Sequence, residues 1–144
     1  MYSQALSFFL YILCYDMWFY ASHVILHTHP IYYIHKIHHG SRYSSLTYRD
    51  TSVAHAFENV IQPLGIFIPL VFNGKSLYVF IFAFFIVSIR GLMRHDFRCA
   101  WLIGNHHLLH HKYINYNYGE YWIDTICGTK YPIESEYIYG KIYT

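Results

Sequence analysis

Residues 23–40 read HVILHTHPIYYIHKIHHG, and six of these eighteen residues are histidine. The first two histidines are four residues apart, and the last three form an H-x-x-H-H motif. The same motif returns as HLLHH at residues 107–111. Residues three or four apart lie on one face of a helix, so each motif is expected to present its imidazoles together. The members of these motifs are His23 and His27, then His35, His38 and His39, and finally His107, His110 and His111.

Eight imidazoles at helical spacing predict a metal site, because imidazole is a good ligand for iron, copper, nickel and zinc. A structural zinc site needs only four ligands, so eight are enough for two ions with open coordination positions. We therefore predict that all eight are metal ligands and that they converge from three or four helical segments. The other histidines of the same tracts, His29 and His106, are interpreted as ordinary surface or core residues.

The composition is typical of a membrane protein. The 144 residues are 55% hydrophobic and 22% aromatic, and their charged share of 12% is about half of the usual value. A net charge of +2 does not indicate a nucleic-acid partner. Three widely spaced cysteines indicate neither a disulfide framework nor a cysteine zinc site. We expect one domain over residues 1–144.

Three apolar runs give the expected architecture. The run over residues 2–28 exceeds the roughly 20 residues that a helix needs to cross a bilayer. Two shorter runs, 60–72 and 76–89, flank the turn signal NGK at 73–75 and predict a helical hairpin. Because a hairpin returns the chain to the side that it left, the histidines before and after it are expected on one face of the membrane.

Arginine and lysine gather on the histidine side of this hairpin, against Lys75 alone at its tip, and the positive-inside rule then places that side in the cytosol. The cations counted are Arg42, Arg49, Arg90, Arg94, Arg98 and Lys112. The predicted fold is therefore an all-α integral membrane protein. It has about three membrane-embedded helices, one span plus the hairpin, under a cytosolic, histidine-rich helical cap.

Four acids are candidates for orienting the imidazoles, because a metal-bound histidine usually donates its second N–H to a carboxylate or carbonyl. Asp16 is the most notable, since an ionisable residue inside an apolar run is costly and is often functional. It precedes His23 by seven residues and lies on the same helical face, so we predict that it accepts a hydrogen bond from a ligand imidazole or from Tyr20. The full set is Asp16, Glu58, Asp96 and Asp124.

The motifs resemble those of the fatty acid hydroxylase / sterol desaturase superfamily, whose members are integral membrane di-iron oxygenases. The resemblance covers about residues 13–130, and the tail HHKYINYNYG is most similar to the C-5 sterol desaturase branch. The segments that carry it are DMWFYASHVILH (16–27), IHKIHHGS (34–41), AHAFEN (54–59) and NYNYGEYWIDTICGT (115–129).

The resemblance implies further site residues and a reaction. His95, in RHDF, resembles part of another histidine box and is the ninth expected ligand, and His55 is a candidate tenth. Two iron ions with O₂ as co-substrate would hydroxylate or desaturate a lipid in lipid biosynthesis. The electrons would come from a partner such as a b-type cytochrome and its reductase, since the sequence has no flavin or haem motif. The location would be the endoplasmic reticulum if the protein is of eukaryotic type.

The chain also departs from the family pattern. It begins at what resembles the second span of larger members, so an upstream helix is expected to be missing, and Cys99 stands where a further histidine ligand would follow His95. The alternative is therefore a non-catalytic or decayed family member that binds metal in the membrane. The helical spacing of the motifs on both sides of the hairpin favours an enzyme. The sequence leaves sterol, fatty-acyl and sphingolipid substrates open, and equally hydroxylation and desaturation.

Overall fold

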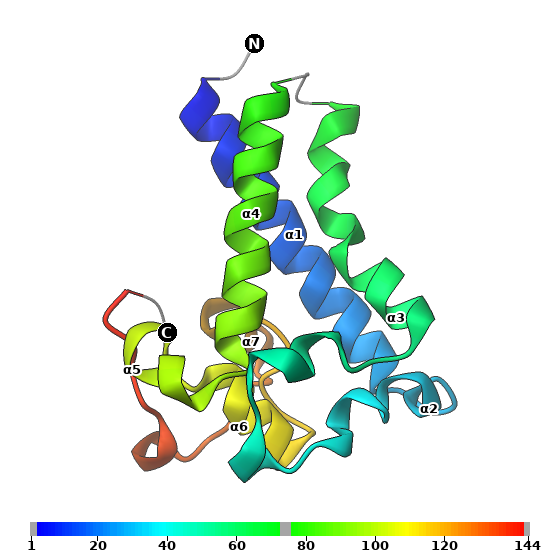
Figure 1. The fold of residues 1–144 in the computed structure, drawn as a ribbon, viewed down its shortest axis with the longest axis vertical. Helices are drawn as coiled ribbons and strands as arrows, with labels where there is room; N and C mark the ends of the chain where they lie inside the picture. Colours follow the sequence, from blue (N-terminus) through cyan, green and yellow to red (C-terminus); the bar gives the residue numbers. More distant parts are fainter. Residues whose placement is uncertain (1–2, 73–75, 143–144) are drawn as a thin grey trace.

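The computed structural model describes residues 3–72 and 76–142, and every element within them is helical. Three long arms run side by side, and the short helices gather at the end away from the N-terminus (Figure 1). The arms are α1 (Gln4–Leu26), α3 (Ala56–Ile61) continued by η4 (Gln62–Val71), and α4 (Leu77–Arg94). The all-α prediction is confirmed for this part of the chain, whereas the predicted turn at 73–75 lies outside the described residues.

Helix α1 has 23 residues, without proline or glycine, which suits a continuous helix. Ser3 caps its start, where the side-chain oxygen accepts a hydrogen bond from the Leu6 backbone N–H at 3.2 Å. The helix buries one stripe against the other two arms, with Tyr11 and Tyr15 in the same core cluster as Ile66 of η4 and Val87 of α4. The three arms therefore share one apolar core.

The second arm changes from an α-helix to a 3₁₀-helix where its prolines begin. Proline lacks a backbone N–H and cannot continue the α-helical hydrogen-bond ladder, and η4 has Pro63 in its first turn and Pro69 inside. Gly65 lets this arm approach α1 closely, because a Cβ at this position would lie 2.5 Å from the Trp18 Cβ. The Trp18 indole N–H also donates to the Ile61 carbonyl at 2.7 Å.

Helix α4 extends beyond the apolar run 76–89. It runs to Arg94, and with α1 it is one of two described helices that are long and apolar enough to cross a membrane. Only 17% of its apolar window is buried, and Phe82 and Phe85 are more than half exposed. The helix can extend because its last two arginines are held by acids within the protein rather than by solvent.

These arginines form a buried charged network that corrects the predicted role of Asp16. Asp16 accepts hydrogen bonds from Arg90, at 3.3 Å for one of the two contacts, and Arg94 pairs with Glu120 just before α7 (Tyr121–Cys127). Among the described contacts, Asp16 therefore meets an arginine and not an imidazole or Tyr20. Arg90 and Arg94, two of the cations counted for the positive-inside rule, are both buried or nearly so. The network joins α1, α4 and the chain before α7.

Asp16→Asn is expected to lower the free energy of unfolding by about 3 kcal/mol, because the partly buried Arg90 guanidinium loses the carboxylate with which it forms an ion pair. The measurement is reversible denaturation in detergent, compared with Arg90→Gln and the double variant. Coupling between the two sites should make the double variant less unstable than the sum of the single effects. Additive effects would contradict the direct pairing.

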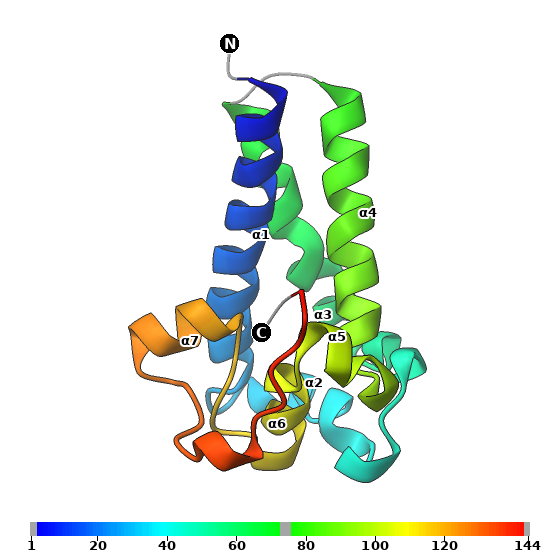
Figure 2. The ribbon, with the colours of Figure 1, turned by 90° about the vertical axis from the view of Figure 1, so that its left-hand side faces the viewer.

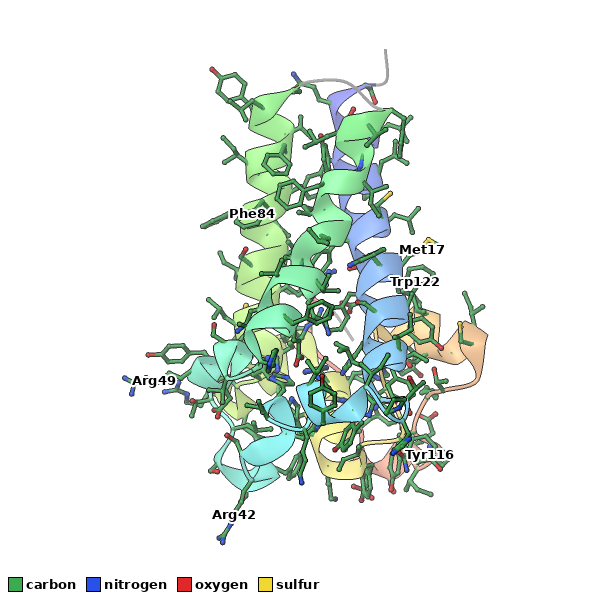
Figure 3. All side chains as sticks on the ribbon, turned by 90° about the vertical axis from the view of Figure 1, so that its right-hand side faces the viewer. Met17, Arg42, Arg49, Phe84, Tyr116 and Trp122 are labelled. Carbon is green, nitrogen blue, oxygen red and sulfur yellow. The ribbon has the colours of Figure 1, made fainter. Side chains whose placement is uncertain are left out.

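The histidine-bearing segments lie together below the three arms (Figure 2). These segments are α2 (Tyr32–His35), η1 (His38–Gly40) and α6 (His106–Tyr113). Arg42 and Arg49 extend outward at the same end (Figure 3). The remaining short helices are η2 (Tyr43–Ser45), η3 (Tyr48–Ser52), η5 (Phe97–Cys99), α5 (Ala100–Ile103) and η6 (Glu134–Glu136).

Candidate metal centre

All nine predicted ligands meet at this end of the bundle, where they form two groups. Within each group, one ring nitrogen of every histidine lies within 4.8 Å of the corresponding nitrogens of the others. Return of the chain along α4 brings the motifs before and after it together, as a hairpin requires. The first group is His23, His27, His35, His39 and His110, and the second group is His38, His95, His107 and His111.

The two H-x-x-H-H motifs are each divided between the groups, which corrects the expectation that all three members face the same way. His35 and His39, four residues apart, belong to the first group, and His38 belongs to the second. The later motif is divided in the opposite sense, with its four-apart pair in the second group and His110 in the first. Each motif therefore supplies a pair to one group and a single ligand to the other.

The first group places nitrogen lone pairs against one another. The His23 Nδ1 lies 2.5 Å from the Tyr118 carbonyl, which can only accept, so Nδ1 carries the proton and Nε2 the lone pair. His35 has Nδ1 2.6 Å from the Glu58 carboxyl group, and with Glu58 ionised Nδ1 donates and Nε2 again carries the lone pair. The two Nε2 atoms are nevertheless only 2.9 Å apart, and His39 Nε2 is also 2.9 Å from that of His35. Facing lone pairs repel, so this arrangement calls for a cation between them.

The second group follows the same rule. His38 donates from Nδ1 to the Val53 carbonyl at 3.2 Å and His95 to the Gly91 carbonyl at 2.9 Å, while their Nε2 atoms face each other at 3.0 Å. Two lone pairs at this distance repel each other, so the second group also calls for a cation.

Burial keeps the imidazoles in the neutral form that binds metal. Burial, and then the neighbouring imidazoles, hold the pKa values of His107 and His110 well below the usual range. The same causes lower the pKa of His39 to about 3. Among the described residues, no hydrogen-bond partner reaches either ring nitrogen of His111, although this side chain is only 8% exposed. A buried imidazole without a partner is expected where a metal ion is the missing partner.

Two of the four acids support this centre. Glu58 contacts the ligand imidazole of His35 directly, as described above. Asp124 acts through the backbone: it is fully buried and accepts hydrogen bonds from the N–H groups of Tyr118 at 2.9 Å and Gly119 at 2.8 Å. It thereby holds the turn whose carbonyl accepts the hydrogen bond from His23. It also lies 3.0 Å from His106, which belongs to neither group.

Two other candidates lie elsewhere. Asp96 bonds to the Arg98 side chain and to the Tyr48 backbone N–H, at 3.3 Å for the latter, so no imidazole among its described partners depends on it. His55 is exposed and outside both groups, because its Nδ1 accepts the Phe57 backbone N–H at 3.1 Å and so caps α3. The structure therefore does not bring His55, the candidate tenth ligand, together with the other nine histidines.

Several groups at the site could not have been found from residue types, because they are backbone carbonyls. Those of Tyr118, Tyr116, Val53 and Gly91 accept hydrogen bonds from imidazoles of the two groups. Asn117 is an indirect indication of the turn that bears two of these carbonyls. It adopts a positive φ of 58°, which asparagine tolerates better than most residues. Its buried side chain fixes the turn by donating to the His106 carbonyl at 3.0 Å.

A cavity of about 210 Å³ adjoins the histidines and has members of both groups in its wall. Aromatic rings of α1, those of Tyr15 and Phe19, form part of its lining. Arg94 lies over the Phe19 ring, 5.2 Å from its centre. The site therefore combines a set of convergent nitrogen ligands with an adjacent space for a small part of another molecule.

Glu58→Gln is expected to weaken metal binding to the first group about 10- to 100-fold, because Glu58 fixes the orientation and basicity of His35. The measurement is a metal titration of the purified protein under anaerobic conditions. Asp96→Asn is the matched control, since Asp96 adjoins a ligand in sequence but none of its described partners is an imidazole. Equal affinities for parent and Glu58→Gln would contradict the role of this contact.

Comparison with known proteins agrees with this geometry. The family model for fatty acid hydroxylase matches residues 8–129, a range that contains both histidine groups. A Delta(7)-sterol 5(6)-desaturase of Gibberella zeae is 33% identical over 138 residues, which cover 87% of this chain and 42% of the desaturase. The chain thus spans less than half the length of this relative. No solved structure matches the present chain. Because the family match covers most of the sequence and every convergent histidine, the chain belongs to the fatty acid hydroxylase family.

Proposed function

We propose that the chain is the catalytic part of a membrane oxidoreductase that binds two iron ions and hydroxylates or desaturates a lipid. The observation that carries this proposal is the convergence of nine buried or partly buried imidazoles into two groups with lone pairs facing inward. Nine ligands exceed the needs of one structural zinc ion. Sites rich in imidazole suit iron, among other transition metals.

The residues around such a site would have three roles: to bind the iron, to orient the imidazoles and to limit water. Bound iron would supply the activation of O₂ that oxidation of an unactivated C–H bond requires. The imidazoles would hold it, and Glu58 with the carbonyls of Tyr118 and Val53 would keep the rings in place. The rings of Tyr15 and Phe19 would limit water in the adjacent cavity, where the reacting carbon would lie.

The substrate is proposed to be a lipid, because the site adjoins helices with apolar, exposed flanks. Helices α1 and α4 would cross the bilayer, and exposed side chains such as Phe82 and Phe85 would face its acyl chains. The likeness to a sterol desaturase favours a sterol over a fatty acyl chain, and desaturation over hydroxylation. We place the histidine end in the cytosol, at the endoplasmic reticulum, where an external donor such as a b-type cytochrome with its reductase would deliver electrons.

The proposal is tested with the full chain in phosphatidylcholine vesicles, loaded anaerobically with Fe(II) and given a Δ7-sterol, O₂, a b-type cytochrome and its reductase. The expected result is a sterol lighter by two hydrogens in mass spectrometry, formed by the parent and by His55→Ala but not by His107→Ala. Lipid profiles of cells with and without the chain test the same reaction with the native lipid pool. Two bound irons without any change in these lipids would support a non-catalytic or decayed protein instead.

A further inference from the structure

Two neighbouring cavities share part of their walls between the flank of the bundle and the histidines. The outer cavity, of about 270 Å³, lies between η4 and α4 and has apolar walls that include Ile66, Phe84 and Val87. Phe84 projects from α4 toward the outside (Figure 3). The outer and inner cavities share the lining residues Tyr15, Thr51, Ser52, Pro63 and Gly91. These five shared residues are the throat between the two cavities.

Gly91 is unusual at this throat because nothing in the fold requires a glycine there. It lies inside α4, where glycine costs stability relative to alanine, and its φ is not in the left-handed region. Among the described residues outside its own helical turn, a Cβ would meet the Thr51 Cγ2 at 3.8 Å, which is ordinary van der Waals contact. Gly65, by contrast, is required by packing. The absent side chain of Gly91 therefore keeps space open rather than relieving a clash.

The throat is also directly connected to the second group of histidines. The Gly91 carbonyl accepts hydrogen bonds from the His95 Nδ1 at 2.9 Å and from the Thr51 hydroxyl at 3.3 Å. A molecule that passes Gly91 therefore arrives beside a ligand imidazole.

The opposite flank of α4 does not offer such a route. A groove of about 350 Å³ there is lined by apolar residues that include Phe8, Ile12, Ile86 and Ile89, and it reaches Arg90. Of the described residues, no histidine lines this groove. The side of α4 that faces η4 is therefore the one that leads from the apolar flank to the site.

We propose that Gly91 is the specificity-determining residue of a lipid passage between η4 and α4, and that its missing side chain admits a rigid, fused-ring lipid of the sterol type. The proposal rests on the proposed function for the nature of the occupant. A fused ring system cannot bend around an added side chain, whereas a linear acyl chain can change its torsion angles. Width at the throat should therefore matter more for a sterol than for a fatty acid.

The test uses light-induced labelling of the full chain in phosphatidylcholine vesicles, which needs no turnover. The probes are a sterol with a diazirine on its ring system and a palmitic acid with a diazirine in its chain. Gly91→Ala is expected to lower sterol labelling of α4 and η4 peptides while palmitate labelling stays unchanged. Gly91→Leu should lower sterol labelling about tenfold or more, because the larger side chain overfills the throat. Ser88→Phe narrows the outer cavity away from His95 and should act similarly.

Ile89→Phe, on the opposite flank of the same helix, is the matched control and should label like the parent. Metal content, measured on every variant, should be unchanged in Gly91→Ala and Ser88→Phe. Sterol labelling that survives both Gly91→Leu and Ser88→Phe, or that is lost in Ile89→Phe, would overturn the passage. Preferential labelling of the parent by palmitate would overturn the sterol occupant. Labelling that depends on Gly91 in an iron-loaded protein without product would instead refute the proposed reaction and leave the passage standing.

Discussion

Replacing His107 by alanine is expected to remove the metal ion of the second group and to abolish turnover. His107 is buried and its Nε2 lies 3.1 Å from that of His95, so its loss opens one coordination position in a four-histidine group. Loss of a group that only accepts a hydrogen bond from a metal-binding histidine costs about 10- to 100-fold in metal affinity. Loss of the histidine itself should exceed that range. Iron content of the anaerobically purified protein should fall from close to two ions per chain to close to one.

The corresponding change in the first group is His110→Ala, which should remove the other ion. His110 Nε2 lies 3.0 Å from His39 Nε2, and its Nδ1 is 2.6 Å from the Tyr116 carbonyl. His110 thus has the arrangement of His95 in the second group, with Nδ1 on a backbone carbonyl and Nε2 facing another imidazole. His55→Ala is the control, because this histidine is exposed and outside both groups, and it should retain both ions and full turnover. Two ions retained by both single variants would refute the assignment of the groups.

Asp124→Ala is expected to lower the free energy of unfolding by about 3–5 kcal/mol, because it removes a buried acceptor shared by several donors. The carboxylate is fully buried and accepts from two backbone N–H groups and from the Thr129 hydroxyl at 2.6 Å, besides its contact with His106. The buried Gly119 N–H and the partly buried Tyr118 N–H would each lose this acceptor. The turn that orients His23 should loosen at the same time, so metal affinity of the first group should fall as well.

Chemical denaturation in detergent, followed by tryptophan fluorescence, measures the loss of stability for Asp124→Ala. Glu134→Ala is the control, since Glu134 is mostly exposed and bonds to Lys130 on the surface. His106→Ala should reproduce a smaller part of the Asp124 effect, with the metal ligands intact, because it removes only one of the donors. A stability equal to that of the parent in Asp124→Ala would show that the turn is held by other contacts.

The sequence by itself determined the helical class of the described residues and the set of nine convergent histidines. The helical class and eight of the nine histidines depend on short-range regularities, namely apolar runs and imidazoles three or four residues apart, which can be recognised without knowing the partners. His95 has no such spacing, and the resemblance to the family pointed to it. The sequence did not determine where each helix ends. Helix α4 continues to Arg94 because Asp16 and Glu120, distant in sequence, neutralise its arginines.

The tertiary structure alone decided how the nine histidines divide into two groups. Spacing places His35, His38 and His39 close together, yet the chain turns between α2 and η1 so that His38 faces His95, 57 residues away. It also decided that Asp16 accepts hydrogen bonds from Arg90, and that backbone carbonyls such as that of Tyr118 orient the imidazoles. The physical reason is the same in each case. These contacts depend on how α1 packs against η4 and α4, and packing between distant segments leaves no period in the sequence.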